Sequence, residues 1–287
     1  MKFILEFIPL KIAVFILGLL PRSIALKIGK GAGSLACWMM KSRYHVARQN
    51  ILASLPGTTE DDVRRIVTGC WQNLGQLAAE ISSSPFITKE KFFSIADFKG
   101  MEHVWASYAK GKGALLICGH YGPWEFYLQI FALSGIPIEV VARRIKNPYV
   151  DVLINYYRTF HGIQIILSKN AVRNTLRALK EGKMVGILID HNVREGGLRI
   201  PFLGRMTNTT SLPAILALRL GVPVHFIRGW REGEKIKSEI LPAMNFAGVP
   251  NNPEGIEKVT QMMCKVFEDW IREKPENWFW IHNRWKN

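Results

Sequence analysis

The carboxyl-terminal two thirds of the chain alternate short apolar runs with longer amphipathic segments. Apolar runs of five or six residues between Gly, Pro and Asn predict buried strands, and the amphipathic segments predict helices. The predicted strands are 114–118, 138–142, 163–167, 184–189, 222–227 and 236–241. The predicted helices are 124–133, 148–160, 171–180, 211–220 and 254–272. Strict alternation of this kind predicts an α/β fold with a largely parallel mixed sheet flanked by helices.

The amino-terminal part has a different pattern. Residues 24–82 predict helices, with a helix start at Thr58-Thr59-Glu60-Asp61, where acidic residues favour the first turn. The glycines of 31–36 fit a loose dinucleotide fingerprint, but no strand precedes them, so the match is a decoy. We therefore expect a single domain over 23–287, helical over 23–100 and with its α/β catalytic core over 101–287. No Pro/Gly/Ser-rich linker divides the 287 residues.

Residues 3–20 are almost wholly apolar, interrupted by Glu6, Pro9 and Lys11. As a helix they would measure about 27 Å, close to the ~30 Å hydrocarbon core of a bilayer. The pattern predicts a membrane anchor over 1–22, either spanning or interfacial, preceding the catalytic part as a membrane-docking region. Cationic residues follow this segment and only Lys2 precedes it, so for a spanning helix the positive-inside bias predicts a cytoplasmic body. A buried core helix and a cleaved signal peptide are the alternatives.

Composition adds charge and a redox setting to this picture. The chain has 38 Lys and Arg against 23 Asp and Glu, a net charge of +15. Such a surface suits anionic lipid head groups, acidic proteins or phosphates. No nucleic-acid recognition motif accompanies the charge, so we expect no nucleic-acid partner. The four cysteines have neither metal-type spacing nor a disulfide pattern, which favours a reduced compartment.

The segment Ile117-Cys-Gly-His-Tyr-Gly-Pro-Trp-Glu-Phe126 places His120 between a predicted strand and a predicted helix. Ligands of open α/β sheets bind at this carboxyl edge of the strands. Histidine accepts protons near neutral pH, and a carboxylate partner fixes its tautomer. His120 with Glu125 therefore predicts a general base and its orienting partner. The alternative is a core histidine beside a surface glutamate. We expect Cys118 to pack as a small hydrophobic residue rather than act as a nucleophile.

Further motifs share an order along the chain with this segment. They are Arg48-Gln-Asn-Ile-Leu52, Arg143 with Asn147-Pro148, Arg158 with Gly162, Gly186-Ile-Leu-Ile-Asp190, Pro201-Phe-Leu-Gly204 with Thr209-Thr210, and Pro275-Glu-Asn-Trp-Phe-Trp-Ile-His-Asn-Arg-Trp-Lys286. With the His-x4-Glu signature, the chain resembles the bacterial lipid A biosynthesis (late) acyltransferase family of the lysophospholipid acyltransferase superfamily. It departs from the family pattern at Pro123, His191 and Leu203, where Asn, Gln and Phe are common. These departures leave the acceptor lipid open.

The resemblance implies catalysis by His120 and Glu125, with a substrate-binding group around them. Arg143 would contact a phosphate or carboxylate, with a solvated charge as its alternative. Arg158 would bind substrate or form a structural ion pair, and Asp190 would orient the acceptor, pair with an arginine or cap a turn. Gly204, Arg205, Thr209 and Thr210 would bind an anionic head group or the developing oxyanion, with ordinary helix capping as the alternative. The tail 275–286 would be an interfacial edge or a segment packed on the core.

The activity implied is acyl transfer from acyl carrier protein or coenzyme A thioester to a hydroxyl of a lipid A precursor, at the cytoplasmic face of the inner membrane. No metal and no cofactor beyond the thioester co-substrate is expected. The same chemistry on a lysophospholipid, ornithine lipid or glycolipid is the nearest alternative. A non-catalytic module that binds membrane or carrier protein, and a thioesterase that uses water, are alternatives of other classes. The chain has no Gly-x-Ser-x-Gly elbow, which disfavours a serine hydrolase.

Overall fold

The computed structural model of the chain describes residues 2–193 and 196–286. Residues 1 and 287, the two ends of the expected anchor and catalytic ranges, lie outside the described residues. The helices are α1 Lys2–Leu19, α2 Arg22–Met39, α3 Lys41–Ser54, α4 Glu60–Ser83, α5 Lys89–Ile95, α6 Met101–Tyr108, α7 Trp124–Tyr127, α8 Gln129–Leu133, α9 Pro148–Thr159, α10 Ala171–Lys180, α11 Leu212–Leu220 and α12 Pro253–Glu273. Short 3-10 turns occur at η1 Ser84–Phe86, η2 Ser168–Asn170 and η3 Pro275–Asn277.

The strands are β1 Ala96–Lys99, β2 Ala114–Cys118, β3 Ile138–Ala142, β4 Gln164–Leu167, β5 Met184–Leu188, β6 Gly197–Phe202, β7 Arg205–Thr210, β8 Val224–Glu232 and β9 Lys235–Ile240. Seven of them form one sheet in the order β1-β9-β8-β2-β5-β3-β4. Only the β8–β9 pairing in it is antiparallel, which confirms the α/β class with a mostly parallel mixed sheet. The remaining two, β6 and β7, form a separate hairpin.

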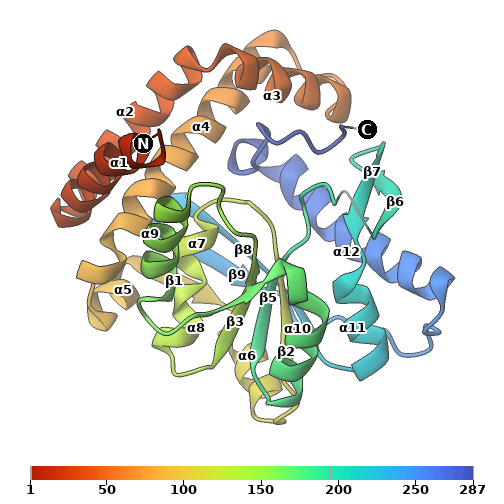
Figure 1. Cartoon of the computed structure of the whole chain (residues 1–287). Coiled ribbons are helices and arrows are strands. Elements are labelled where there is room, and N and C mark those ends of the chain that lie inside the picture. The colour runs from red at the N-terminus through yellow and green to blue at the C-terminus, as the bar shows by residue number, and fades with distance from the viewer. Residues whose placement is uncertain (1, 194–195, 287) are drawn as a thin grey trace.

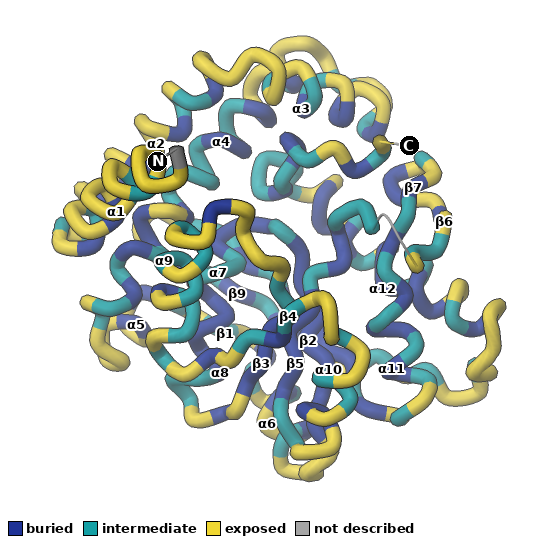
Figure 2. Tube along the Cα trace, in the orientation of Figure 1, coloured by how far each residue is buried: buried dark blue, intermediate teal, exposed yellow. Residues whose placement is uncertain are grey.

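Strand alternation divides the core between the two faces of the sheet. On β2, Leu115 and Ile117 point into one buried cluster together with α10, α11 and α12. Ala114, Leu116 and Cys118 point into the other cluster, which includes side chains of α5, α6, α7 and α8. Burial on both faces explains why the strands in the sequence are continuous apolar runs. Figure 2 shows the buried sheet at the centre of the molecule.

Helices α1, α2 and α4 form a layer to one side of the sheet, and α9 lies next to it (Figure 1). The N-terminus of α4 has a capping box between Thr59 and Asp62, as the acidic start of the segment predicts. Helices α2 and α4 cross in backbone contact, because a Cβ on Gly75 would lie 1.9 Å from the carbonyl oxygen of Gly29. The glycines of α2 thus allow close helix packing. This agrees with the prediction that they are not a dinucleotide-binding motif.

Several elements differ from the sequence prediction. Helix α5 agrees with the prediction of a helical region over 23–100, whereas strand β1 contradicts it at 96–99. Helix α6 and the β6–β7 hairpin were not predicted, because their short or polar segments carry no clear periodicity. The predicted helix 124–133 is divided into α7 and α8, and β8 extends to Glu232 where it pairs with β9. The expected anchor segment forms α1. Within 2–193 and 196–286, no helix is both long and apolar enough to cross a bilayer.

Candidate active site

The parallel register of β2 and β5 brings His120 and Asp190 together. Cys118 and Leu188 are paired neighbours at the carboxyl ends of these adjacent strands. His120 and Asp190 each lie two residues beyond that pair, one on each strand's exit loop. Asp190 therefore occupies the sheet edge expected of it, but its partner is His120 rather than an arginine. The structure gives His120 this carboxylate as its hydrogen-bond partner, not Glu125.

Two hydrogen bonds connect His120 to Asp190, one from the imidazole and one from the backbone. Its Nδ1 lies 2.8 Å from Oδ1 of Asp190, and its backbone N–H donates to Oδ2 at 2.8 Å. An ionised carboxylate can only accept, so Nδ1 carries the ring proton and Nε2 carries the lone pair. The His120 side chain keeps 20 % of its surface exposed, whereas Asp190 is 1 % exposed. This tautomer makes Nε2 competent to take a proton from a bound hydroxyl.

Asp190 is stabilised as an anion despite its burial. Burial alone would raise its pKa, but the charge and hydrogen bond of His120 and the hydrogen bond from Trp278 hold that pKa well below its usual range. The indole Nε1–H of Trp278 donates to Oδ2 at 2.8 Å. Sequence reasoning assigned no chemistry to Trp278, and nothing in the local sequence distinguishes it from the other tail tryptophans.

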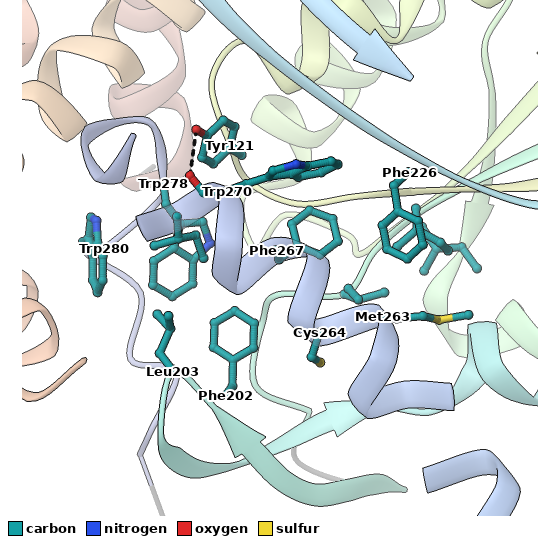
Figure 3. Close-up of a cluster of buried hydrophobic side chains, with 14 of the residues drawn as sticks. Tyr121, Phe202, Leu203, Phe226, Met263, Cys264, Phe267, Trp270, Trp278 and Trp280 are labelled. Carbon is teal, nitrogen blue, oxygen red and sulfur yellow. Dashed lines mark hydrogen bonds between the residues drawn. The ribbon is translucent and has the colours of Figure 1, made fainter. Parts of the chain in front are cut away.

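The carboxyl-terminal tail holds the His120 loop in place. Tyr121 and Trp278 form an antiparallel bridge, and the N–H of Phe279 donates to the carbonyl of His120 at 3.1 Å. Trp278 and Trp280 are buried beside Tyr121, Phe202 and α12 (Figure 3). Of the two placements considered for the tail, packing on the core is confirmed.

Gly122 lets the His120 loop pass against β8. Its φ is +59°, and a Cβ would lie 1.9 Å from the carbonyl oxygen of Gly229 on β8. Only glycine accepts both the left-handed conformation and this contact. The chain then turns into the short helix α7, which carries Glu125.

Glu125 is paired with Arg158 of α9. Nε of Arg158 donates to Oε2 of Glu125 at 2.7 Å, and Nη2 donates to Oε1, so the pairing is bidentate. The two side chains are 18 % and 15 % exposed. Burial would lower the pKa of Arg158, but the charge and hydrogen bond of Glu125 raise it instead. Of the two roles expected for Arg158, the ion pair is the one observed.

Arg143 lies at the same edge of the sheet. It follows β3 directly, and β3 is parallel to β5 and β4. The side chain is exposed and forms no ion pair within the described residues. Four residues later, Asn147 caps α9 and donates to the carbonyl of Phe3 and to Glu6, which ties α1 to α9. The Arg-x3-Asn-Pro pattern thus combines a free cation with a structural cap.

The four residues expected near Gly204 lie on the β6–β7 hairpin, not in a loop leading directly to a helix. Leu203 and Gly204 form its turn, both with positive φ. Arg205 lies over the ring of Trp285, 4.3 Å from its centroid. Thr209 accepts a hydrogen bond from the buried Arg284 at 3.0 Å. Thr210 accepts from Leu212 N–H at 3.3 Å, but it precedes Ser211, the N-cap residue of α11, so the expected side-chain cap is not formed. None of the four hydrogen-bonds to His120 or Asp190.

Other candidate chemistry near the site is limited by burial. Cys118 is fully buried in the core, and burial raises the pKa of its thiol, as its packing role predicts. All four cysteines are buried and free. Within the described part of the chain, no group of three or more His, Cys, Asp or Glu side chains could hold a metal ion.

The fold and site define an α/β enzyme with a His–Asp pair suited to general base catalysis at the carboxyl edge of its sheet. Residues 6–287 match the sequence model of the bacterial lipid A biosynthesis acyltransferases. The chain belongs to this family and is an O-acyltransferase.

Relatives with more specific names support the same class. The chain is 26 % identical over 271 residues to the lipid A biosynthesis lauroyltransferase of Escherichia coli K12, covering 93 % of this chain and 87 % of that protein. It is 24 % identical to a lipid A biosynthesis acyltransferase of Haemophilus influenzae, covering 88 % and 79 %. It is 21 % identical to a phosphatidylinositol mannoside acyltransferase of Mycolicibacterium smegmatis, covering 66 % and 62 %. These relatives act on more than one kind of glycolipid by name.

Proposed function

We propose that this protein transfers a fatty acyl group from a thioester to a hydroxyl of a lipid A precursor, with His120 as the general base. The observation that carries the proposal is the tautomer of His120. Its Nδ1–H is held by Asp190, its side chain remains partly exposed, and its Nε2 has no hydrogen-bond partner among the described residues. The acceptor class is taken from the family, whose members are named lipid A biosynthesis acyltransferases.

The proposed step balances without a covalent enzyme intermediate. Nε2 of His120 takes the proton of the acceptor hydroxyl while the oxygen attacks the thioester carbonyl carbon. The tetrahedral intermediate collapses, the carbon–sulfur bond breaks, and the thiolate leaves with the proton returned by the imidazolium. Asp190 stabilises the imidazolium through the hydrogen bond to Nδ1. A base of this kind contributes about 10²- to 10⁴-fold in rate.

Glu125, which the sequence predicted as the orienting partner, keeps a proposed role through Arg158. Their bidentate pair holds α7, which follows the His120 loop, against α9. We assign Glu125 to positioning the loop and leave direct orientation of His120 to Asp190. Arg143, exposed and without an ion pair among the described residues, is the proposed contact for a phosphate of the donor or acceptor. Arg205 and Thr209 contact Trp285 and Arg284 of the tail and are proposed to support the site through it. Gly204 and Thr210 are proposed to support it through the hairpin that carries them.

The donor is proposed to be acyl carrier protein or coenzyme A, both of which present negative charge to a chain of net charge +15. The acceptor hydroxyl would lie on an already attached 3-hydroxyacyl chain of a lipid A precursor. A phosphatidylinositol mannoside or another glycolipid is the second candidate, favoured by the mycolicibacterial relative.

An interfacial membrane location at the cytoplasmic face of the inner membrane completes the proposal. Large apolar side chains are exposed along α1 and α2, and further ones lie on α9, which packs on α1. Figure 2 shows that much of α1 and α2 consists of exposed residues. They include Phe3, Ile4, Leu5, Ile8, Ile12, Phe15, Ile16 and Leu19 of α1, and Ile24, Ile28, Leu35, Trp38 and Met39 of α2. Exposed Lys11, Lys27 and Lys30 lie among them and form no ion pair within the described residues. Apolar side chains interspersed with cations are typical of interfacial helices on anionic membranes.

The experiment is acyl transfer in detergent micelles, with labelled acyl carrier protein or coenzyme A thioester and a panel of lipid acceptors. Wild type and His120→Ala are compared, and the products are identified by mass. We expect acceptor-dependent product from wild type and a loss of about 10²-fold or more in His120→Ala. Equal activity in the two proteins would remove His120 from its role.

The other outcomes separate the alternative functions. Release of free fatty acid without a lipid acceptor would identify a thioesterase that uses water. Membrane or carrier-protein binding that survives His120→Ala, with no product from any acceptor, would identify a binding module. Product from a mannosylated phosphatidylinositol alone would assign the second acceptor class.

A further inference from the structure

Three histidines from separate segments form a column of stacked rings beside Asp190. His120 follows β2, His191 follows β5 and His282 lies in the carboxyl-terminal tail. The rings of His120 and His191 are parallel within 1°, with centroids 3.7 Å apart. Those of His191 and His282 are tilted by 17°, with centroids 4.0 Å apart. His191 therefore contacts both other rings, and it is a position where the sequence departs from the family pattern.

Two rings of the column, the central His191 and the outer His282, are neutral. Burial, and secondly the charge that His120 carries when it is protonated, lower the pKa of His191 to about 2. Burial likewise lowers the pKa of His282 to about 4. The geometry agrees for His282, because its Nε2 accepts the backbone N–H of Asn192 at 3.3 Å and so carries no proton. His191 can therefore face His120 closely without placing a second charge against the imidazolium that forms there.

The hydrogen bond to Asp190 does not by itself fix the orientation of the base. A single Nδ1–H···O contact restrains the direction of one bond, whereas rotation about Cβ–Cγ of a histidine has only broad preferences. The flat face of His191 blocks this rotation on one side of His120. The edge of Trp124, at 5.1 Å and 65°, and the ring of Phe279, at 5.8 Å, provide further aromatic contacts.

His191 contacts His120 through its ring face and not through hydrogen bonds of its ring nitrogens. Its Nε2 is buried and has no hydrogen-bond partner in the part of the chain that the structure describes. Neither nitrogen of His191 takes part in a hydrogen bond there. What His191 offers is a flat aromatic surface held from behind by His282. A glutamine, common at this position in the family pattern, has no such ring face.

We propose that His191 is a positioning residue, whose ring, backed by His282, clamps the imidazole of His120 so that Nε2 points at the acceptor hydroxyl. This inference rests on the proposed function, in which His120 is the general base. Loss of the clamp leaves the Asp190 hydrogen bond in place but frees the ring to rotate. A misplaced catalytic group costs up to about 10²-fold in rate, with substrate binding unchanged.

The test compares His191→Ala, His191→Phe and His191→Gln in the acyl-transfer assay, with wild type and His120→Ala measured in parallel. We expect kcat of His191→Ala to fall about 10- to 100-fold with KM for both substrates unchanged. His191→Phe keeps a flat face and is expected to retain most of kcat, and His191→Gln to resemble His191→Ala. Melting temperatures accompany each variant, so that lost folding is separated from lost positioning.

A second readout follows the His120 ring directly. In ¹⁵N-histidine spectra we expect His120 of His191→Ala to keep its proton on Nδ1 but to show broadened ring signals, whereas His191→Phe keeps them sharp. Wild-type kcat in His191→Ala would overturn the proposal, and so would a folded His191→Phe as slow as His191→Ala. If His120→Ala itself remained active, the proposed function would fail instead, so the two failures are distinguishable.

Discussion

The carboxylate of Asp190 accepts hydrogen bonds from both the backbone N–H and the imidazole Nδ1 of His120, each at 2.8 Å. One buried anion thus holds the loop at the end of β2 and sets the tautomer of the ring. The pair arises from register, because each residue lies two positions beyond the paired strand ends Cys118 and Leu188.

Replacement of Asp190 by Asn tests the tautomer. The amide can donate to Nδ1 through its NH₂ group, which would move the ring proton to Nε2 and leave His120 without a free base. We expect kcat to fall by about 10²- to 10⁴-fold with the fold retained. Asp97→Asn is the control, since Asp97 pairs with Lys237 on the surface. Near-wild-type turnover in Asp190→Asn would show that the tautomer is set in another way.

The Glu125–Arg158 pair predicts a rescue by double substitution. Arg158→Met leaves the carboxylate of Glu125 partly buried without its cation, and we expect a loss of about 2–3 kcal/mol in the free energy of unfolding. Glu125→Gln with Arg158→Met removes both charges and should recover most of that stability. Chemical denaturation measures both.

The activity of the same double variant then decides the role of Glu125. Recovery of activity together with stability supports positioning through the ion pair. A stable double variant without activity would assign Glu125 a direct part in the reaction, as its sequence spacing from His120 first suggested.

The stacked histidines predict acid destabilisation well above the range of the carboxylates. Both His191 and His282 have folded-state pKa values, about 2 and about 4, below the ordinary value of 6.5. Below about pH 6.5 the unfolded chain therefore binds more protons than the folded chain. The stability contribution of these groups is fully present above about pH 6.5 and falls as the pH decreases. Each group contributes a slope of at most about 1.4 kcal/mol per pH unit, for His282 down to about pH 4 and for His191 down to about pH 2.

Asp190 acts at lower pH, because its folded pKa is depressed below the ordinary value of 3.8. Its contribution is present above that value and is lost only as the pH falls below it.

Substitution of both neutral histidines tests this pH dependence. We expect a His191→Phe/His282→Phe variant to lose much of the dependence of the free energy of unfolding on pH between about pH 6.5 and 4, as measured by chemical denaturation. An unchanged slope in a folded variant would contradict the neutral stack.

The absence of a side chain at Gly122 is predicted to be essential for both stability and activity. Alanine there would combine a φ of +59° with a Cβ 1.9 Å from the carbonyl of Gly229. Backbone strain alone costs about 1–3 kcal/mol, and we expect the loss in the free energy of unfolding to exceed it because of the added contact. We also expect activity to be lost, because the His120 loop moves. Gly111→Ala is the matched control, with a φ of +68° and no neighbouring atom within 4 Å of the added Cβ. It should cost about 1–2 kcal/mol and leave kcat unchanged.

The exposed apolar side chains of α1 and α2 predict binding to anionic vesicles. Leu5, Ile12 and Trp38 are 68 %, 54 % and 67 % exposed. Their combined replacement by Ser should weaken co-sedimentation with phosphatidylglycerol-containing vesicles while the melting temperature is kept. Val172→Ser with Met206→Ser, two exposed apolar residues elsewhere, is the control. Equal vesicle binding by both variants would exclude this face as the membrane contact.

The sequence by itself determined the α/β class, the sheet strands with clear apolar runs and the position of His120 at a strand's carboxyl end. These follow from local physics: burial on both faces makes a parallel strand uniformly apolar, and Gly and Pro end it. The family also followed from the sequence, because its motifs occur in order along the chain. The spacing of His120 and Glu125 likewise identified the loop between β2 and α7 as a candidate site.

Only the tertiary structure decided which side chains meet. Local spacing favoured Glu125 as the partner of His120, but Glu125 turns to Arg158 of α9, and Asp190 arrives 70 residues later through the register of β2 and β5. The placement of Trp278 against Asp190, of His191 on the ring of His120 and of His282 on the ring of His191 depends on how distant loops and the tail pack. Strand register and loop packing are set by the whole core, so no local pattern encodes these contacts.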